Sequence, residues 1–133
     1  MTMRARLGGL VTAMVFASPA VATNAAVQAC LDRSRGGEQK SCMEAIHRAA
    51  RAELDAAYRG VLEAARKLDK DSFSESSAIE ASQKAWEAYR DAECGGRIGG
   101  GGWGSGTAVM VMGCYAEKNY ERVQELKVPF DQR

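Results

Sequence analysis

The sequence predicts an all-α fold: a small antiparallel bundle of three helices with a short N-terminal arm and two disulfides. Apolar residues recur at spacings of three and four, as on one face of a helix, and no run alternates like a half-buried strand. A serine-rich and a glycine-rich stretch divide this pattern into three blocks. The chain has 133 residues, the length of one domain, and an even number of cysteines for crosslinks.

The first 22 residues have the regions of a signal peptide: Arg4 and Arg6 form a basic start, an apolar stretch follows, and small residues precede Ala22. Cleavage after Ala22 fits best, and cleavage three residues later is the second choice. The apolar stretch is shorter than the about 20 residues that a transmembrane helix needs, which argues against a retained anchor. We expect residues 23–133 to form one periplasmic or secreted domain, with no membrane span after cleavage.

Charge and composition exclude several classes of function. Without Arg4 and Arg6 the chain has 16 basic and 17 acidic residues, a net charge of −1, so nucleic acid is not an expected partner. His47 is the only histidine and no cysteines have the close spacing of a zinc site, so we expect no metal. Because His47 has no evident nucleophile beside it, we expect it at the surface or as a cap and predict no enzyme.

A first helix is expected from Ser41 to near Leu68, after an arm over residues 30–39. Ser41 and Glu44 fit a capping box, in which each side chain bonds a free N–H of the first turn. An apolar stripe follows at helical spacing. It is formed by Ile46, Ala50, Leu54, Ala57, Val61, Ala65 and Leu68.

The second helix is expected from about Ile79 to Cys94. Residues 69–77 before it are polar, and Ser72 and Ser77 each begin a competing capping box. Two glycines after Cys94 favour a helix end at that point. One face of this helix contains Ile79, Ser82, Trp86 and Tyr89.

Residues 95–106 contain eight glycines and are expected to form a loop, because each interior glycine costs a helix about 1 kcal/mol relative to alanine. Some of them match the spacing of a dinucleotide-binding motif, but a helix precedes them where that motif needs a strand, so we expect no cofactor. Thr107 caps a third helix that ends before Pro129. Its apolar face contains Val109, Met112, Ala116, Tyr120, Val123 and Leu126.

The four cysteines, Cys30, Cys42, Cys94 and Cys114, are expected in two disulfides at one end of the bundle. In this topology the first helix starts beside the end of the second, and the third starts at the same end. We favour the local pairs Cys30 with Cys42 and Cys94 with Cys114. A link from Cys42 to Cys94 stays open, because spacing alone does not determine connectivity.

Trp103 is the first candidate for a partner contact, because an aromatic side chain on an adaptable loop is typical of residues that anchor a protein partner. The nearby charged residues Arg97, Glu93 and Asp91 are the other candidates. In the alternative, Trp103 folds back over the end of the bundle, since small domains seldom leave a tryptophan in water.

Three blocks of the sequence resemble the LprI-like lysozyme inhibitor family, and together they cover nearly all of the mature chain. Residues 83–94 are similar to that family's Gln-x-x-Trp-x-x-Tyr/Phe-Arg-Asp-x-x-Cys helix, and the part from Trp86 to Cys94 is the most specific. Asp55 stands where the family's first helix usually has Asn, and the glycine run is longer than in the family. The residues that carry the match are Leu54, Tyr58, Gln83, Trp86, Tyr89, Arg90 and Arg122.

The same residues also predict a structural role. An amphipathic helix buries its aromatic residues, so Trp86 and Tyr89 are expected in the core. Arg90 is expected to hold a carboxylate, such as that of Asp55, or a helix C-terminus.

The resemblance implies an exported inhibitor that blocks the cleft of lysozyme, with the loop around Trp103 as the plug. Lysozymes are commonly basic, but a net charge of −1 offers little general attraction, so any charge complementarity is expected to be local. The alternative is an envelope accessory or interaction module with another, unknown protein partner, because a shared fold does not transfer a shared target.

Overall fold

The computed structural model describes residues 19–33, 35–70, 74–102 and 104–128, with burial described from residue 25 onward. This part of the chain is all-helical, which confirms the predicted class, but it contains four α-helices where three were expected. They are α1 (Pro19–Leu31), α2 (Gly37–Arg66), α3 (Glu75–Asp91) and α4 (Thr107–Lys127).

The additional helix, α1, lies mostly before the predicted arm of residues 30–39 and overlaps only its first two residues, while α2 takes up residues 37–39. Its alanine-rich stretch from residue 25 to 30 favours a helix, and Val27 and Cys30 are buried. Both pack in a cluster with Met43 and Ala116 from α2 and α4. The arm prediction was wrong because α1 has only a few buried apolar positions, Val27 and Cys30 among them. So few positions do not indicate a helix in the sequence until the surface of α2 and α4 that they cover is known.

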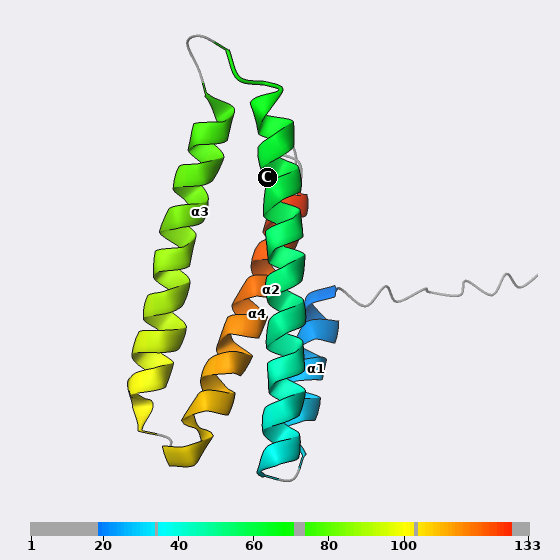
Figure 1. Ribbon diagram of the computed structural model, residues 1–133, viewed down its shortest axis with the longest axis vertical. Helices are drawn as coiled ribbons and strands as arrows, with labels where there is room; N and C mark the ends of the chain where they lie inside the picture. The colour runs from blue at the N-terminus through cyan, green and yellow to red at the C-terminus, as the bar shows by residue number, and fades with distance from the viewer. Residues whose placement is uncertain (1–18, 34, 71–73, 103, 129–133) are drawn as a thin grey trace, which may run out of the picture.

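The helices are arranged around the pair α2 and α4, which lie side by side (Figure 1). α3 runs antiparallel to α2 on one side of this pair, and α1 lies on the other side (Figure 1). α1 packs against both α2 and α4. None of the described helices combines the length and apolar character needed to cross a membrane.

Three apolar clusters form the core. One joins α1, α2 and α4 and contains Val27, Cys30, Met43, Ala50, Val109 and Ala116. The second joins α2 and α4 through Leu54, Val123 and Leu126, with the partly buried Trp86 of α3 packed against it. The third joins the first turns of α3 to the last turns of α2 through Ile79, Leu62 and Ala65.

The starts of α2 and α3 differ from the predicted caps. α2 begins at Gly37, so the predicted start at Ser41 was wrong; Gly36, with φ of 127°, occupies the N-cap position. The early start lets Gln39 Nε2 donate to the last carbonyl of α1, on Leu31, at 2.9 Å. α3 begins at Glu75, and its cap is Ser74, whose hydroxyl accepts from the Ser77 N–H at 3.2 Å.

The glycine-rich segment forms helical turns where a loop was expected. α3 passes into a π-helix, η1 (Ala92–Ile98), and two short 3₁₀ turns follow, η2 (Gly99–Gly101) and η3 (Gly104–Gly106). The helix therefore does not end at Cys94 as predicted. A side chain at Gly95 would place its Cβ 3.2 Å from the Tyr115 hydroxyl, so the absence of a side chain permits the close approach of η1 to α4.

The two disulfides join Cys30 to Cys42 and Cys94 to Cys114, the local pairing that the sequence favoured over a Cys42 to Cys94 link. Both lie at the same end of the bundle, where α1 and α3 finish and α2 and α4 begin (Figure 1). We call this the disulfide end.

Candidate functional site

Four residues of the sequence signature, Gln83, Trp86, Arg90 and Arg122, meet in one layer between α3 and α4. The Trp86 ring lies between two guanidinium groups, with its centroid 5.1 Å from Arg90 Cζ and 5.6 Å from Arg122 Cζ. Arg90 Cζ is also 5.1 Å from the centroid of the Tyr115 ring. The four side chains form a stack in which arginine and aromatic groups alternate, and each contact is a cation–π interaction.

Hydrogen bonds hold Arg122, the arginine at the end of this stack. Arg122 is buried, and its Nε donates to Gln83 Oε1 at 3.2 Å. Its two terminal nitrogens donate to Ser82 Oγ at 3.0 Å and Glu125 Oε2 at 2.9 Å. A buried guanidinium is tolerated when its donors are used in this way.

Arg90 is held by a second set of bonds. Its Nη1 donates to Asn119 Oδ1 at 3.1 Å, and its Nε and Nη2 both donate to Asp91 Oδ1, at 3.0 and 2.8 Å. We call the whole set the arginine–tryptophan layer. Its members are Gln83, Trp86, Arg90, Tyr115, Asn119 and Arg122.

The hydrogen bonds of the layer join α3 to α4. No described buried side-chain nitrogen or oxygen lacks a hydrogen-bond partner. The signature residues Leu54 and Tyr58 contribute to the apolar clusters beside it, Leu54 buried and Tyr58 partly buried. Apart from Tyr89, which is exposed, the signature residues thus lie buried or partly buried within the fold.

Two of the predicted roles need correction. Tyr89 was expected in the core but is 54% exposed, because it lies on the outer side of α3, where its ring is 5.8 Å from Lys118 Nζ. Arg90 holds a carboxylate as expected, but it is that of Asp91 and not the suggested Asp55. Trp86 packs against the core as predicted, although it stays partly exposed.

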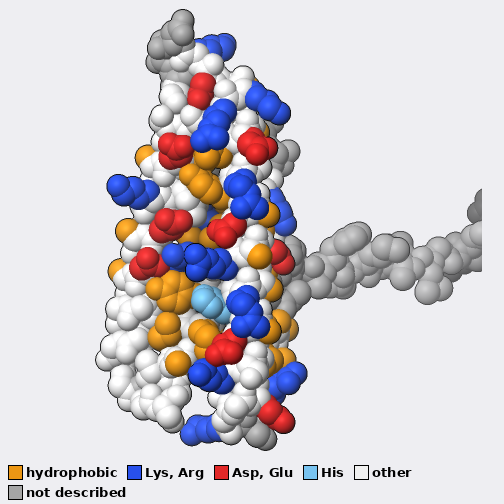
Figure 2. Space-filling view, in the orientation of Figure 1, with side chains coloured by type: hydrophobic (Ala, Val, Ile, Leu, Met, Phe, Trp, Pro, Cys, Tyr) orange, Lys and Arg blue, Asp and Glu red, His pale blue; other side chains and the backbone are white. Residues whose placement is uncertain are grey.

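Beside the layer, on the side of the disulfide end, lies a group of basic and aromatic side chains. The His47 and Tyr115 rings are 5.9 Å apart between centroids, at an interplanar angle of 59°. Figure 2 shows the chain's single histidine on this face, bordered by hydrophobic and basic side chains. We define the His47 patch as His47, Arg48, Arg51, Arg90 and Tyr115.

Burial and positive charge act together on His47. Burial lowers the pKa of its imidazole below the ordinary value of 6.5, and Arg51, Arg90 and Arg48 lower it further. The imidazole is therefore neutral at neutral pH. Tyr115 is affected in the opposite sense: burial, the charge of Asp91 and a hydrogen bond with Asp91 raise the pKa of its phenol.

This patch is not predicted by the sequence. His47 was expected at the surface or as a cap, whereas it is partly buried and lies in the middle of α2. No role was expected for Tyr115. The spacing of His47 and Arg51 by four residues was a usable signal, because it places both side chains on one face of a helix.

Trp103, the first predicted partner contact, lies outside the described residues. The other three candidates are engaged within the chain: Asp91 accepts from Arg90, and Glu93 accepts from Arg97 Nε at 2.8 Å. The hydrogen bond from Arg97 lowers the pKa of Glu93. These three residues lie at the disulfide end, next to the His47 patch through the contact of Asp91 with Tyr115.

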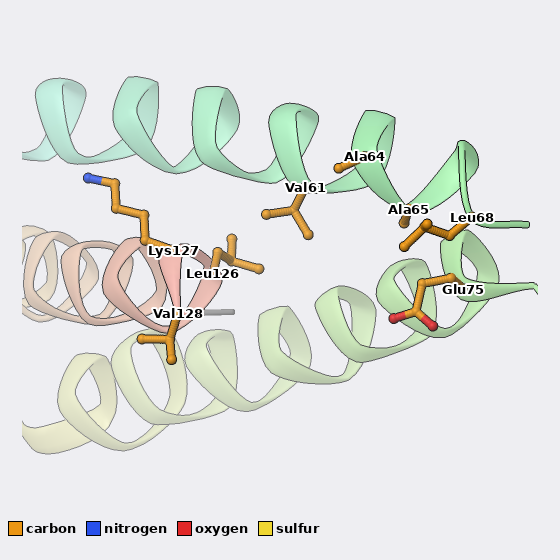
Figure 3. Close-up of a pocket in the computed structure, with 8 residues that line it drawn as sticks. All are labelled: Val61, Ala64, Ala65, Leu68, Glu75, Leu126, Lys127 and Val128. Carbon is orange, nitrogen blue, oxygen red and sulfur yellow. The ribbon is translucent and has the colours of Figure 1, made fainter. Parts of the chain in front are cut away.

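An apolar pocket lies at the opposite end of the bundle, with a volume of about 200 Å³ (Figure 3). It is lined by Val61, Ala64, Ala65, Leu68, Glu75, Leu126, Lys127 and Val128. Small-molecule sites usually measure about 300 to 1,000 Å³, so this one has the size for a single side chain. Within the described residues, no group of His, Cys, Asp and Glu is arranged to hold a metal ion.

Comparisons with known proteins agree with the resemblance found in the sequence. The family profile described as "Lysozyme inhibitor LprI" matches residues 24–126, which include both disulfides and the arginine–tryptophan layer. An uncharacterised protein of Rhizobium meliloti (strain 1021) is 38% identical over 96 residues, which cover 65% of this chain and 67% of that protein. No solved structure matches the chain. By the extent of the family match, the chain belongs to the LprI lysozyme inhibitor family.

Proposed function

We propose that this chain is an extracytoplasmic inhibitor of lysozyme that binds over the enzyme's cleft. The observation that carries this proposal is the family match over residues 24–126, which spans the whole bundle from α1 to α4. The two disulfides support a site of action outside the cytoplasm, because crosslinks of this kind persist in oxidising compartments.

The fold suits an inhibitor that binds as a rigid body. The disulfides crosslink the end of α1 to α2 and the end of α3 to α4, and the arginine–tryptophan layer connects α3 to α4 further along. A surface that is already ordered loses little conformational entropy on binding. Most of the signature side chains pack within the fold, so the contacts with the enzyme are made by the exposed residues around them.

The disulfide end is the surface that we propose for these contacts. It includes the turns η1, η2 and η3 and the charged residues Asp91, Glu93 and Arg97, and Trp103 stands in the same stretch of the sequence. Glycines lower the bulk of this end, so that it can enter a concave surface. A cleft-blocking inhibitor has no catalytic residue, and we propose no enzyme activity and no cofactor.

The test is a titration of the purified, oxidised chain lacking residues 1–22 against c-type, g-type and bacterial lysozymes. Cell-wall lysis and direct binding are measured on the same samples. Stoichiometric inhibition of at least one class is expected. A folded, oxidised protein that binds none of the three classes at high micromolar concentration would overturn the proposal and favour an envelope module with another protein partner.

A further inference from the structure

The His47 patch brings positive charge together on one face between α2 and α3. Arg48 and Arg51 are exposed on α2, one and four residues after His47, and Arg90 reaches the same place from α3. Among the described residues, neither Arg48 nor Arg51 has a carboxylate within ion-pair distance, whereas Arg90 is paired with Asp91. Two guanidinium groups are thus available to an outside anion.

The surroundings of these charges strengthen an electrostatic contact. His47 and Tyr115 are partly buried, and the Arg90 side chain is only 18% exposed, stacked on the Tyr115 ring. Aromatic walls exclude water, so a charge that docks against them is screened less than on an open helix surface. The described acidic residues near the patch in the chain include Asp91, already bound to Arg90, and Glu44, 3.8 Å from Lys40. Glu53 and Asp55 follow Arg51 by two and four residues on α2, and both are exposed.

The proposed function supplies an anion of matching chemistry. Glycoside hydrolases, lysozyme among them, act with two carboxyl groups that flank the scissile bond in the cleft. An inhibitor that covers such a cleft must neutralise these groups or leave them buried without partners, which is costly. The net charge of −1 offers no general attraction, so a local basic patch has to provide the complementarity.

We propose that the His47 patch is a carboxylate-binding surface, and that Arg48 and Arg51 bind the catalytic carboxylates in the lysozyme cleft. Arg90 and Tyr115 position the patch, because their side chains are already engaged in the arginine–tryptophan layer. This inference rests on the proposed function and adds the chemistry by which the partner is recognised. It extends the contact surface from the disulfide end onto the face shown in Figure 2.

The test uses charge reversal at Arg51 and a matched control at Arg59. Both residues are exposed on α2, and Arg59 lies two turns further along the helix, away from His47. Arg51→Glu and Arg59→Glu change the net charge equally. We expect Arg51→Glu to weaken inhibition of a c-type lysozyme by about tenfold or more, and Arg59→Glu by less than about twofold. Far-UV circular dichroism of both variants checks that the helices are intact.

A double-mutant cycle identifies the group that is bound. The lysozyme carries Gln in place of its general-acid Glu, and binding is measured directly because this enzyme is inactive. If Arg51 binds a cleft carboxylate, Arg51→Glu lowers the affinity for the Gln enzyme by a smaller factor than the affinity for the unmodified enzyme.

The failures are distinguishable. Equal inhibition by the unmodified chain, Arg51→Glu and Arg59→Glu would refute the patch and leave the proposed function standing. If Arg51→Glu lowered the affinity for both enzymes by the same factor, the general-acid carboxyl group would not be the group that Arg51 binds. Absence of inhibition by the unmodified chain would overturn the proposed function, and the patch with it.

Discussion

Replacing Arg122 by Ala tests whether the arginine–tryptophan layer holds the bundle together. Arg122 is 9% exposed, and its partner Gln83 is 4% exposed. The substitution leaves the buried Gln83 Oε1 without its donor, which costs about 1 to 3 kcal/mol. It also removes the guanidinium from the face of Trp86, worth about 1 kcal/mol. The expected loss in the free energy of unfolding is therefore about 2 to 4 kcal/mol.

The measurement is thermal and urea unfolding of oxidised protein, followed by far-UV circular dichroism. For a domain of this size the loss corresponds to a fall in Tm of roughly 8 to 16 °C. Arg122→Lys keeps the charge but not the forked donor geometry, so an intermediate loss is expected. Arg59→Ala, at an exposed position, is the control and should change stability by less than about 0.5 kcal/mol. If Arg122→Ala were as stable as this control, the layer would be a consequence of helix packing and not a cause of it.

Three further predictions concern the crosslinks, the glycine-rich end and pH. Replacing Cys94 and Cys114 together by Ser, which opens a loop of sequence separation 20, should lower the free energy of unfolding by about 3 kcal/mol in denaturant titrations; an unchanged midpoint would contradict this. Trp103→Ala should weaken lysozyme inhibition without altering the helical spectrum, and undiminished inhibition would remove Trp103 from the contact surface. His47 has a pKa below 6.5 in the folded chain, so the unfolded chain binds its proton first as the pH falls. The stabilisation from its neutral form is complete above pH 6.5 and is lost as the pH falls through the folded-state pKa. His47→Gln should flatten the stability profile in this window, and an identical profile would show that His47 does not contribute.

Much of the candidate site lay beyond sequence reasoning. The block from Gln83 to Arg90 was recognised as distinctive, but its hydrogen-bond partners on α4 come from 29 to 39 residues further along the chain. Asn119 and Tyr115 have no local signal that marks them as partners of Arg90. Their contact depends on which face of α4 is turned toward α3, and that rotation is set by packing over the whole bundle.

The exposed position of Tyr89 has the same origin. Trp86 and Tyr89 are three residues apart, so both fit one helix face. Long side chains of the layer join α3 to α4, and the part of α3 that packs inward is a narrow strip at Ile79, Gln83 and Trp86. A helical period of apolar residues predicts which face of a helix is buried. It does not predict how far around the helix that buried face extends.

The sequence by itself determined the features that depend on local chemistry: the helical class, the approximate spans of α2, α3 and α4, and the family. It favoured the two local disulfides but left a Cys42 to Cys94 link open, and the structure decided between them. Apolar spacing, turn residues and cysteine proximity act over a few residues, so they can be read along the chain. Tertiary structure decided the existence of α1, the π-helical course of the glycine run, the partners of Arg90 and the gathering of basic residues around His47. These features depend on surfaces brought together from distant segments, where burial and close packing outweigh local propensity.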